Sequence, residues 1–565
     1  MITLKDYQNR VLDSLRGFFS QCSRDGHPAN AFHDMQVKNA RDPVPYIPVH
    51  AAGLAPSMPY VCLRVPTGGG KTLLACHTAG IAMKQLLRAE QSVVLWLVPR
   101  STILQQTAEA LRDNRHPYRR ALEMECGSVE VVTIDEALRL SRAAVDGQTV
   151  VIVATIQSFR AEDTAGRKVY GQNGSFAEHL QNVPTDRLDG LLKGADGKPV
   201  PSLVNMLRLR RPIVIVDEAH NARTELSFAM LGDVKPSCII EFTATPARKK
   251  NPSNVLHMVS AAELNAAHMV KLPLKVFKRD PSQRDLLLAD AVSLRSDLEK
   301  QAVAEAQATG EYIRPIMLVQ AERIDDCLPL REQLVSEFGM KQEAILISTG
   351  KLDELAKVKD IESPKCPVRV IITVQKLSEG WDCPFAYVLC SLKQTRSATA
   401  IEQIVGRILR LPKVEKKQIG DLNCSYVFSV SDSLGAVLAE LRDALESNGF
   451  TKAEAERIVL PVSQGVLPMG VQPRKVRVKT TEMESFALNA EASALAGKVE
   501  FDQASGDLTI FVPLDEGEVE ALSGCVSDSG ARRLIHDAAE QVRETERAFG
   551  GSGDSRIPSP YERQL

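Results

Sequence analysis

The stretch RVPTGGGKTLLA, residues 64–75, places three glycines, a lysine and a threonine between two apolar segments. Residues 60–65 are rich in β-forming residues and are bounded by Pro66, which predicts a short buried strand. Residues 72–90 carry apolar side chains at helical spacing, so the glycines link a strand to a helix. A glycine turn at a helix N-terminus offers backbone N–H groups and the positive end of the helix dipole to an anion.

Each part of this turn suits one part of a nucleoside triphosphate. The glycines at 68–70 leave room for the backbone to wrap the phosphates. Lys71 can reach the β- and γ-phosphate oxygens, and the hydroxyl of Thr72 can bind magnesium. The pattern GxxxxGK[ST] would require glycine where this chain has Val65. On this stretch alone, a glycine-rich loop ahead of an ordinary helix is therefore the alternative.

A second stretch, RRPIVIVDEAHNA at residues 210–222, ends an apolar run in two carboxylates. A buried parallel strand would place Asp217 and Glu218 at its C-terminal end, where ligands bind in open α/β sheets. Asp217 could then hold magnesium, directly or through water, and Glu218 could polarise an attacking water. An acidic pair after a strand is by itself more often a helix N-cap. Together with GGGKT, however, the pair predicts a site for ATP and Mg²⁺.

Four segments occur in the order of motifs I, II, III and VI of superfamily 2 helicases: PTGGGKT at 66–72, VDEAH at 216–220, FTATPAR at 242–248 and IEQIVGRILRLP at 401–412. Together they resemble a DEAH-type member. LSEGWDCP at 377–384, followed by TRSATAIEQIVGRILR, is similar to the ATPase (Res) subunit of type III restriction enzymes and to related bacterial proteins. The resemblance spans residues 8–410 and implies two RecA-like lobes.

The second half of the chain again alternates strand-like with helix-like segments, as in RPIMLVQAE, VRVIITVQKL and FAYVLCSLK. This alternation predicts a second parallel-sheet domain. No glycine-rich lysine turn recurs there, so one nucleotide is expected, in the cleft between the lobes. We expect an α/β fold with RecA-like lobes at 1–272 and 273–432, a C-terminal α+β accessory region at 433–549, and a linker or tail at 550–565.

The resemblance also implies roles for residues outside the glycine turn and the acidic pair. Gln8 would read the adenine edge, since its amide offers both a donor and an acceptor. Thr243 and Thr245 would bridge His220 to the nucleic-acid side. Asp382 would approach the nucleotide ribose or the other lobe.

An arginine-bearing helix is predicted at QIVGRILR, where Gln403, Arg407 and Arg410 fall at i, i+4 and i+7 on one face. The rest of this helix is apolar, which suggests a cleft wall, although solvated charge is the alternative for two arginines on one stripe. In the cleft, Arg407 and Arg410 would stabilise charge on the transferring phosphoryl group.

Nucleic-acid contacts are implied for two strand-end loops of the first lobe. By resemblance, Arg100, Thr155 and Gln157 would lie near the nucleic-acid backbone, where such groups bond phosphate and sugar without reading sequence. Ordinary polar loop residues are the alternative for each.

The candidate residues therefore divide by role. The catalytic candidates are Lys71, Glu218, Gln403, Arg407 and Arg410. The ATP-binding candidates are Gln8, Thr67, Gly68, Gly69, Gly70, Lys71, Thr72 and Asp382. The metal ligands expected are Thr72 and Asp217.

Composition limits the partners and the compartment. The 565 residues carry a formal net charge of −2 at pH 7, so nucleic-acid contacts must use local basic surfaces. No apolar stretch approaches the ~20 residues that a membrane span needs. The 11 cysteines include no CxxC pair, which favours reduced thiols in the cytoplasm over a zinc ribbon or a disulfide framework.

These observations predict an ATP- and Mg²⁺-dependent DNA helicase or translocase, with restriction or defence against foreign DNA as the setting that the resemblance implies. Duplex DNA is the expected partner, together with a methyltransferase or other subunit that supplies sequence choice. The alternatives are a strand-separating DNA or RNA helicase in repair or RNA metabolism and an ATP-gated binding switch in a multiprotein complex. No nuclease is predicted. A metal-dependent nuclease needs carboxylates and a lysine to hold metal and activate water, but Glu415, Lys416 and Lys417 are expected to form a solvated charge run in a polar loop.

Overall fold

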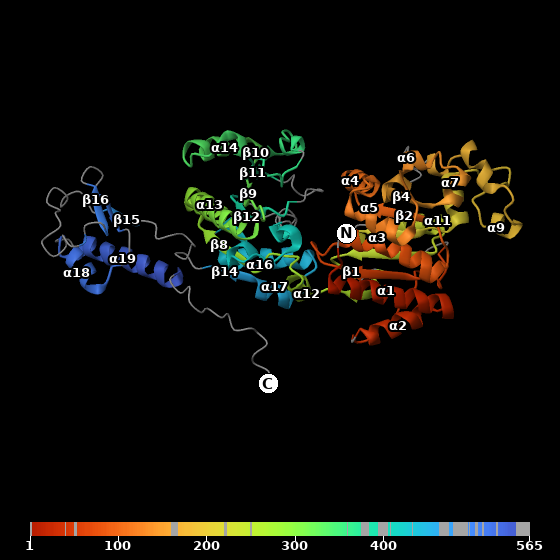
Figure 1. The fold of residues 1–565 in the computed structure, drawn as a ribbon, viewed down its shortest axis with the longest axis horizontal. Coiled ribbons are helices and arrows are strands. Elements are labelled where there is room, and N and C mark those ends of the chain that lie inside the picture. Colours follow the sequence, from red (N-terminus) through yellow and green to blue (C-terminus); the bar gives the residue numbers. More distant parts are fainter. Residues whose placement is uncertain are drawn as a thin grey trace.

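The computed structural model describes most of the chain between residues 3 and 549. Inside that span the description leaves out residues 40, 50–53, 160–167, 220–222, 249–250, 359, 375–382, 394–404, 407, 432, 463–473, 478–494, 496–497, 503–506, 511–513 and 527–528. Two parallel sheets and a smaller antiparallel sheet hold the described strands. Figure 1 shows three regions built on these sheets, which follow one another along the longest axis of the molecule.

The first sheet has seven strands in the order β3-β4-β2-β5-β6-β1-β7, and all its pairs are parallel. Its strands are β1 (Tyr60–Arg64), β2 (Val93–Val98), β3 (Val129–Thr133), β4 (Thr149–Thr155), β5 (Ile213–Asp217), β6 (Cys238–Thr243) and β7 (Val255–Met258). Every residue of β1, β2, β4 and β6 is buried. Such continuous burial is expected where helices cover both faces of a parallel sheet.

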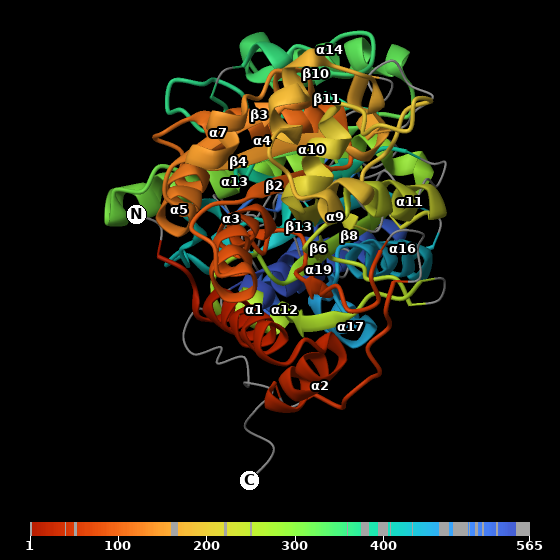
Figure 2. The same cartoon turned by 90° about the vertical axis from the view of Figure 1, so that its right-hand side faces the viewer.

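Helices lie on both faces of the first sheet. One face is covered by α1 (Asp6–Asp25), α3 (Lys71–Ile81), α4 (Ser101–Arg112) and α5 (Pro117–Cys126). The other is covered by α10 (Leu203–Arg210) and α11 (Glu225–Val234). Figure 2 shows α3 and α5 on one side of β2 and α11 on the other. Successive residues of β2 point to opposite faces, so Trp96 is buried on the first face and Leu95 on the second.

Shorter helices belong to the same lobe. They are α2 (Pro28–Lys38), η1 (Ala82–Leu87), α6 (Ile134–Ala137), α7 (Arg142–Gly147), η2 (Ile156–Phe159), η3 (Gly174–Leu180), α9 (Thr185–Asp189) and α12 (Ala261–Ala266).

The second sheet also has seven parallel strands, in the order β10-β11-β9-β12-β13-β8-β14. They are β8 (Leu274–Arg279), β9 (Ile316–Gln320), β10 (Ile345–Ser348), β11 (Val370–Thr373), β12 (Ala386–Ser391), β13 (Ser425–Val430) and β14 (Val459–Pro461). Its longer helices are α13 (Arg284–Thr309), α14 (Cys327–Ser336), α16 (Leu434–Ser447) and α17 (Lys452–Ile458). The predicted fold of two RecA-like parallel-sheet lobes is confirmed.

The third region contains β15 (Arg474–Arg477), β16 (Val499–Asp502) and β17 (Asp507–Ile510), paired antiparallel in the order β15-β17-β16. Two helices, α18 (Glu516–Ser523) and α19 (Ser529–Phe549), pack against these strands. The predicted domain boundaries stay a prediction. The second sheet nevertheless extends past residue 432, because β14 pairs with β8.

The prediction of a solvated charge run at 415–417 is wrong for its last residue. Glu415 and Lys416 are exposed, but Lys417 is buried. Its Nζ lies 2.5 Å from Oε1 of Glu311. The partner is distant in the sequence, so a local charge pattern could not reveal that Lys417 is paired inside the second lobe.

Among the residues that the structure describes, no helix has the length and apolar character needed to cross a membrane.

The contact between α3 and α5 depends on the absence of a side chain at Gly80. A Cβ added at Gly80 would lie 2.5 Å from Cβ of Glu125 and 2.8 Å from its carbonyl oxygen. Alanine favours a helix over glycine by about 1 kcal/mol, but overpacking costs about 1–3 kcal/mol. We expect Gly80→Ala to lower the urea midpoint followed by circular dichroism. The control is Gly147→Ala in α7, whose added Cβ would meet no described atom within 4 Å. A Gly80→Ala midpoint at or above that of the control would contradict this packing.

Candidate functional site

The C-terminal ends of β1, β5 and β6 lie side by side at one edge of the first sheet. Asp217, the last residue of β5, pairs in register with Phe242 of β6. Arg64, the last residue of β1, pairs with Thr243. The glycine turn, the DEAH segment and the FTATPAR segment therefore leave the sheet at neighbouring positions, where open α/β sheets bind their ligands.

The glycine turn between β1 and α3 requires its glycines. Gly68 and Gly70 have φ angles of 85° and 75°, a left-handed conformation that glycine adopts without steric cost. A Cβ on Gly69 would lie 2.5 Å from Cγ1 of Val65. Val65, where the strict pattern has glycine, is fully buried and packs against the turn. The turn thus keeps its tight path, and α3 begins directly after Gly70.

The loop lysine meets the two carboxylates. Nζ of Lys71 lies 2.8 Å from Oε1 of Glu218, with the lysine side chain largely buried. The N–H of Glu218 donates to Oδ1 of Asp217 at 3.0 Å. Burial, reinforced by the charge of Glu218, raises the pKa of Asp217 to about 6, although Lys71 opposes the shift. The three groups assigned to phosphate, magnesium and water therefore lie together.

The donor set at this point fits magnesium. Mg²⁺ in phosphate-handling sites is usually held by one or two carboxylates plus substrate phosphates and waters. The carboxylate of Asp217 ends β5, and the hydroxyl of Thr72 lies in the first turn of α3. No group of three or more His, Cys, Asp or Glu side chains that could hold a metal occurs among the described residues. These two residues are thus suited to a magnesium ion shared with a nucleotide.

Helix α1 packs directly on the glycine turn. The hydroxyl of Tyr7 donates to the carbonyl oxygen of Gly69 at 2.8 Å. Gln8 is buried, and its Oε1 accepts the N–H of Lys5 at 3.0 Å. A Cβ on Gly70 would lie 2.8 Å from Nε2 of Gln8. Gln8 therefore touches the turn, and an adenine would have to compete with Lys5 for its oxygen.

Arg410 lies on extended backbone, and its predicted helical position is wrong. It forms an antiparallel bridge with Val270 in the connection between the lobes. Backbone hydrogen bonds also join residues 409–411 to residues 269–271. Pro412 follows Leu411, and a proline pushes the residue before it away from the α conformation. Pairing with the connection thus ends the helix before Arg410.

Arg410 nevertheless lies beside the glycine turn. A Cβ on Gly68 would lie 3.6 Å from Cγ of Arg410. An arginine of the second lobe therefore borders the turn of the first. Four other predicted site residues lie outside the described residues: His220, Asp382, Gln403 and Arg407.

Thr243 and Thr245 lie at the end of β6, next to the glycine turn. Oγ1 of Thr243 accepts the N–H of Thr245 at 3.1 Å, which fixes the start of the loop. The carbonyl oxygen of Thr243 accepts the N–H of Val65 at 3.1 Å. The FTATPAR segment is thus bonded to the residue that enters the glycine turn.

The residues predicted to contact nucleic acid lie at the ends of two neighbouring strands, since Val98 of β2 pairs with Thr155 of β4. Arg100 and Gln157 are exposed. Thr155 is buried, and its Oγ1 lies 2.9 Å from Oγ of Ser158. Arg100 and Gln157 can therefore reach a ligand at this edge, while the hydroxyl of Thr155 is used locally.

The turn between α16 and α17 makes a contact that no motif in the sequence indicates. The Arg64 guanidinium donates to the carbonyl oxygens of Ala244 at 3.3 Å and Gly449 at 2.8 Å. The carbonyl oxygen of Asn448 accepts the N–H of Thr67 at 3.0 Å. One turn of the second lobe thus contacts both the glycine turn and the FTATPAR segment. Its only sequence signal is a glycine after a helix, which is common at helix ends.

This contact predicts that Gly449→Ala weakens the association of the lobes. A Cβ on Gly449, which has a φ of 96°, would lie 2.9 Å from both Cβ and the carbonyl oxygen of Ala244. We expect a lower unfolding midpoint and a larger radius of gyration in X-ray scattering. Gly310→Ala is the matched control, because its φ is 75° and an added Cβ would meet no described atom within 4 Å. Identical scattering by both variants would show that the turn does not hold the lobes together.

Comparison with solved structures found relatives at low identity. One is "ATP-dependent Type ISP restriction-modification enzyme LlaBIII bound to DNA", at 15% identity and a TM-score of 0.44, covering 79% of this chain and 30% of that chain. Another is S. cerevisiae Dbp5 bound to RNA and ADP BeF3, at 14% identity and a TM-score of 0.38, covering 72% and 85%. A third is a fragment of a putative HsdR subunit of a type I restriction enzyme from Vibrio vulnificus YJ016, at 14% identity and a TM-score of 0.40, covering 81% and 71%. This chain thus spans 30% of the LlaBIII chain's length.

Comparison with curated proteins found no match. Residues 1–248 match the family model described as type III restriction enzyme, res subunit. The matched span includes the glycine turn, the DEAH segment and FTATPAR. The resemblance predicted from the motifs is therefore confirmed for residues 1–248, which are similar to the res subunit of type III restriction enzymes.

Proposed function

We propose that this chain is an ATP- and Mg²⁺-dependent motor that moves along duplex DNA in restriction or another defence against foreign DNA. The observation that carries the proposal is the meeting of Lys71, Asp217 and Glu218 beside a glycine turn at a helix N-terminus. A helix N-terminus and a lysine attract phosphate. The two carboxylates supply the metal ligand and the base that ATP hydrolysis needs.

A phosphate that enters the turn would compete with Glu218 for Lys71, because the lysine now pairs with that carboxylate. Once Lys71 pairs with phosphate, Glu218 can accept a hydrogen bond from a water and orient it for attack. Mg²⁺, when bound by Thr72 and Asp217, would neutralise charge on the phosphate oxygens. The residues thus divide into a phosphate clamp, a metal ligand pair and a base.

The contact between lobes supports coupling of hydrolysis to movement. Arg410 borders Gly68, and the connection at 269–271 holds the backbone on which Arg410 lies. An arginine brought from another lobe completes a phosphoryl-transfer site only when the lobes are closed. Hydrolysis would then depend on lobe position, as a translocating motor requires.

Duplex DNA as the track, and a methyltransferase or other restriction subunit as the partner, rest on the family. Exposed Arg100 and Gln157 support backbone contacts at the strand-end edge. The competing proposals are a strand-separating helicase and an ATP-gated binding switch. All three proposed functions would use the same residues of the candidate site. The preference for one kind of nucleic acid must therefore distinguish these functions.

Glu218→Gln is expected to lower kcat for ATP by about 10²–10⁴, the usual contribution of a general base, while nucleotide still binds. ATP turnover should be measured without nucleic acid and with duplex DNA, single-stranded DNA and RNA. Glu109→Gln, at an exposed position of α4, is the matched control and should keep wild-type turnover.

Stimulation by duplex DNA alone supports the motor on duplex. Preference for single strands or RNA favours the strand-separating helicase. If wild-type turnover is no higher than that of Glu218→Gln with every polymer, the proposed motor is refuted and the binding switch is favoured.

The raised pKa of Asp217 predicts a pH-dependent metal site. Because this pKa is raised from 3.8 to about 6, the folded protein holds a proton that the unfolded chain lacks within that window. The stability contributed by this group is therefore present at low pH and is lost as pH rises through the window. Metal binding needs the deprotonated carboxylate, so we expect Mg²⁺ affinity to fall by about tenfold per pH unit below that pKa.

The measurement is a Mg²⁺ titration of nucleotide binding at several pH values on both sides of this pKa. Asp217→Asn should bind Mg²⁺ weakly at every pH and lose the pH dependence. A wild-type Mg²⁺ affinity that is constant across the range would exclude Asp217 as the titrating ligand.

A further inference from the structure

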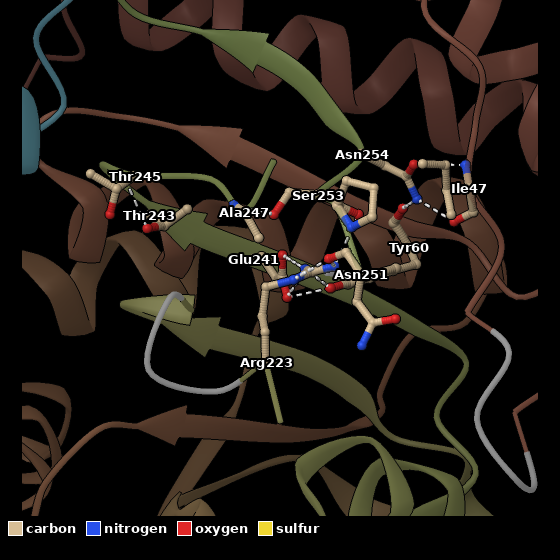
Figure 3. A network of polar contacts seen from close by, with 11 residues as sticks. Ile47, Tyr60, Arg223, Glu241, Thr243, Thr245, Ala247, Asn251, Ser253 and Asn254 are labelled. Atoms are coloured by element: carbon tan, nitrogen blue, oxygen red, sulfur yellow. Dashed lines mark hydrogen bonds and ion pairs between the residues drawn. The ribbon is translucent and has the colours of Figure 1, made fainter. Parts of the chain in front are cut away.

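A buried ion pair lies beneath the strand ends that carry the candidate site (Figure 3). Arg223 follows the DEAH segment, and Glu241 lies on β6 two residues before Thr243. Nη1 of Arg223 lies 2.6 and 2.5 Å from the two carboxylate oxygens of Glu241. The two side chains are only 6% and 4% exposed. The pair therefore ties the chain leaving motif II to the strand entering motif III inside the protein.

The same guanidinium holds the loop that leaves FTATPAR. Its Nε and Nη2 donate to the carbonyl oxygen of Asn251 at 2.9 and 2.6 Å, and Nη2 donates to that of Pro252 at 3.1 Å. Ser253 in turn bonds Ala247 twice: its Oγ accepts the Ala247 N–H at 3.2 Å, and its N–H donates to the Ala247 carbonyl at 2.9 Å. Arg223 thus anchors the far end of the motif III loop.

The beginning of β1 belongs to this network as well. The hydroxyl of Tyr60 bonds to Glu241, and the Arg223 guanidinium lies 5.2 Å from the centre of the Tyr60 ring. Nδ2 of Asn254 donates to the carbonyl oxygen of Tyr60 at 3.1 Å. Figure 3 shows Glu241 and Asn251 at the Arg223 guanidinium, and Asn254 beside Tyr60 and Ile47.

The geometry allows a displacement at motif II to reach motif III. Asp217 is fixed by the ladder of β5, and Arg223 is fixed by Glu241. Side chains two residues apart on a strand share a face, so Glu241 and Thr243 lie on the same side of β6. A guanidinium can bond a carboxylate and a carbonyl at once, whereas the single ammonium group of lysine cannot reproduce this fork.

We propose that Arg223 is a positioning residue that couples the DEAH segment to the motif III loop, so that nucleotide bound near Glu218 changes the contacts of Asn251 and Pro252. The inference rests on the proposed ATP-driven function, in which phosphate takes Lys71 from Glu218. Arg223 touches neither nucleotide nor metal in this scheme. It acts through Glu241 and through the loop carbonyls.

A purely structural ion pair is the competing explanation, and a double substitution separates the two. Removing one partner of a buried pair leaves an uncompensated charge, whereas replacing both by apolar residues of similar volume is often tolerated. Arg223→Met and Glu241→Leu should each lower the melting temperature. The double variant Arg223→Met/Glu241→Leu should recover most of that loss, yet it lacks the bonds to Asn251 and Pro252.

The double variant is expected to bind ATP with little change in KM while stimulation by duplex DNA falls about 5- to 150-fold, the size of a typical coupling between sites. Lys417→Met/Glu311→Leu removes a comparably buried pair in the second lobe and should keep wild-type stimulation. Arg223→Lys should keep the charge near Glu241 and still lose most of the stimulation. Wild-type stimulation in a stable double variant would overturn the proposal.

Hydrogen exchange gives a readout that is independent of turnover. A non-hydrolysable ATP analogue is expected to change amide exchange in the peptide containing residues 251–253 of the wild type and the Lys417/Glu311 control. The double variant should show no such change. An equal change in the double variant, or no change in the wild type, overturns the coupling. Absence of wild-type turnover with every polymer would instead refute the proposed motor, while the exchange result still decides the role of Arg223.

Discussion

The parallel pairing of β1, β5 and β6 is the constraint on which the candidate site depends. Because the strands run in one direction, the glycine turn, Asp217 and Thr243 leave the sheet at one edge. A register slip of one residue would turn each side chain to the opposite face and would separate Asp217 from Lys71. The buried apolar residues of these strands therefore fix the positions of the site residues.

The lobes are joined by backbone contacts at the same place. The connection at 269–271 pairs with residues 409–411, and the carbonyl oxygen of Asn448 accepts the N–H of Thr67. Backbone bonds of this kind depend on position more than on side-chain identity. They hold Arg410 beside the glycine turn without a helix, so rotation of the second lobe would move the arginine and the turn's support together.

The local parts of the site could be predicted from the sequence because their signals are local. Glycines between a strand and a helix, and carboxylates after an apolar run, lie within a few residues of one another. Arg410 was wrongly placed because helical spacing says nothing of pairing with a distant segment. The ion pairs of Lys417 with Glu311 and of Arg223 with Glu241 could not be predicted for the same reason, because the partners become neighbours only in the folded chain.

The charges at the site also bear on the proposed function, in which Glu218 is the general base. The ammonium group of Lys71 lies 2.8 Å from the carboxylate of Glu218. Under the proposed function, a triphosphate would offer Lys71 other anionic partners and would thereby release Glu218. If Arg223 couples this exchange to the motif III loop, the step that activates the base also changes contacts at the edge of the sheet. ATP hydrolysis and movement of the motif III loop would then both depend on Lys71 changing its partner from the carboxylate of Glu218 to a phosphate.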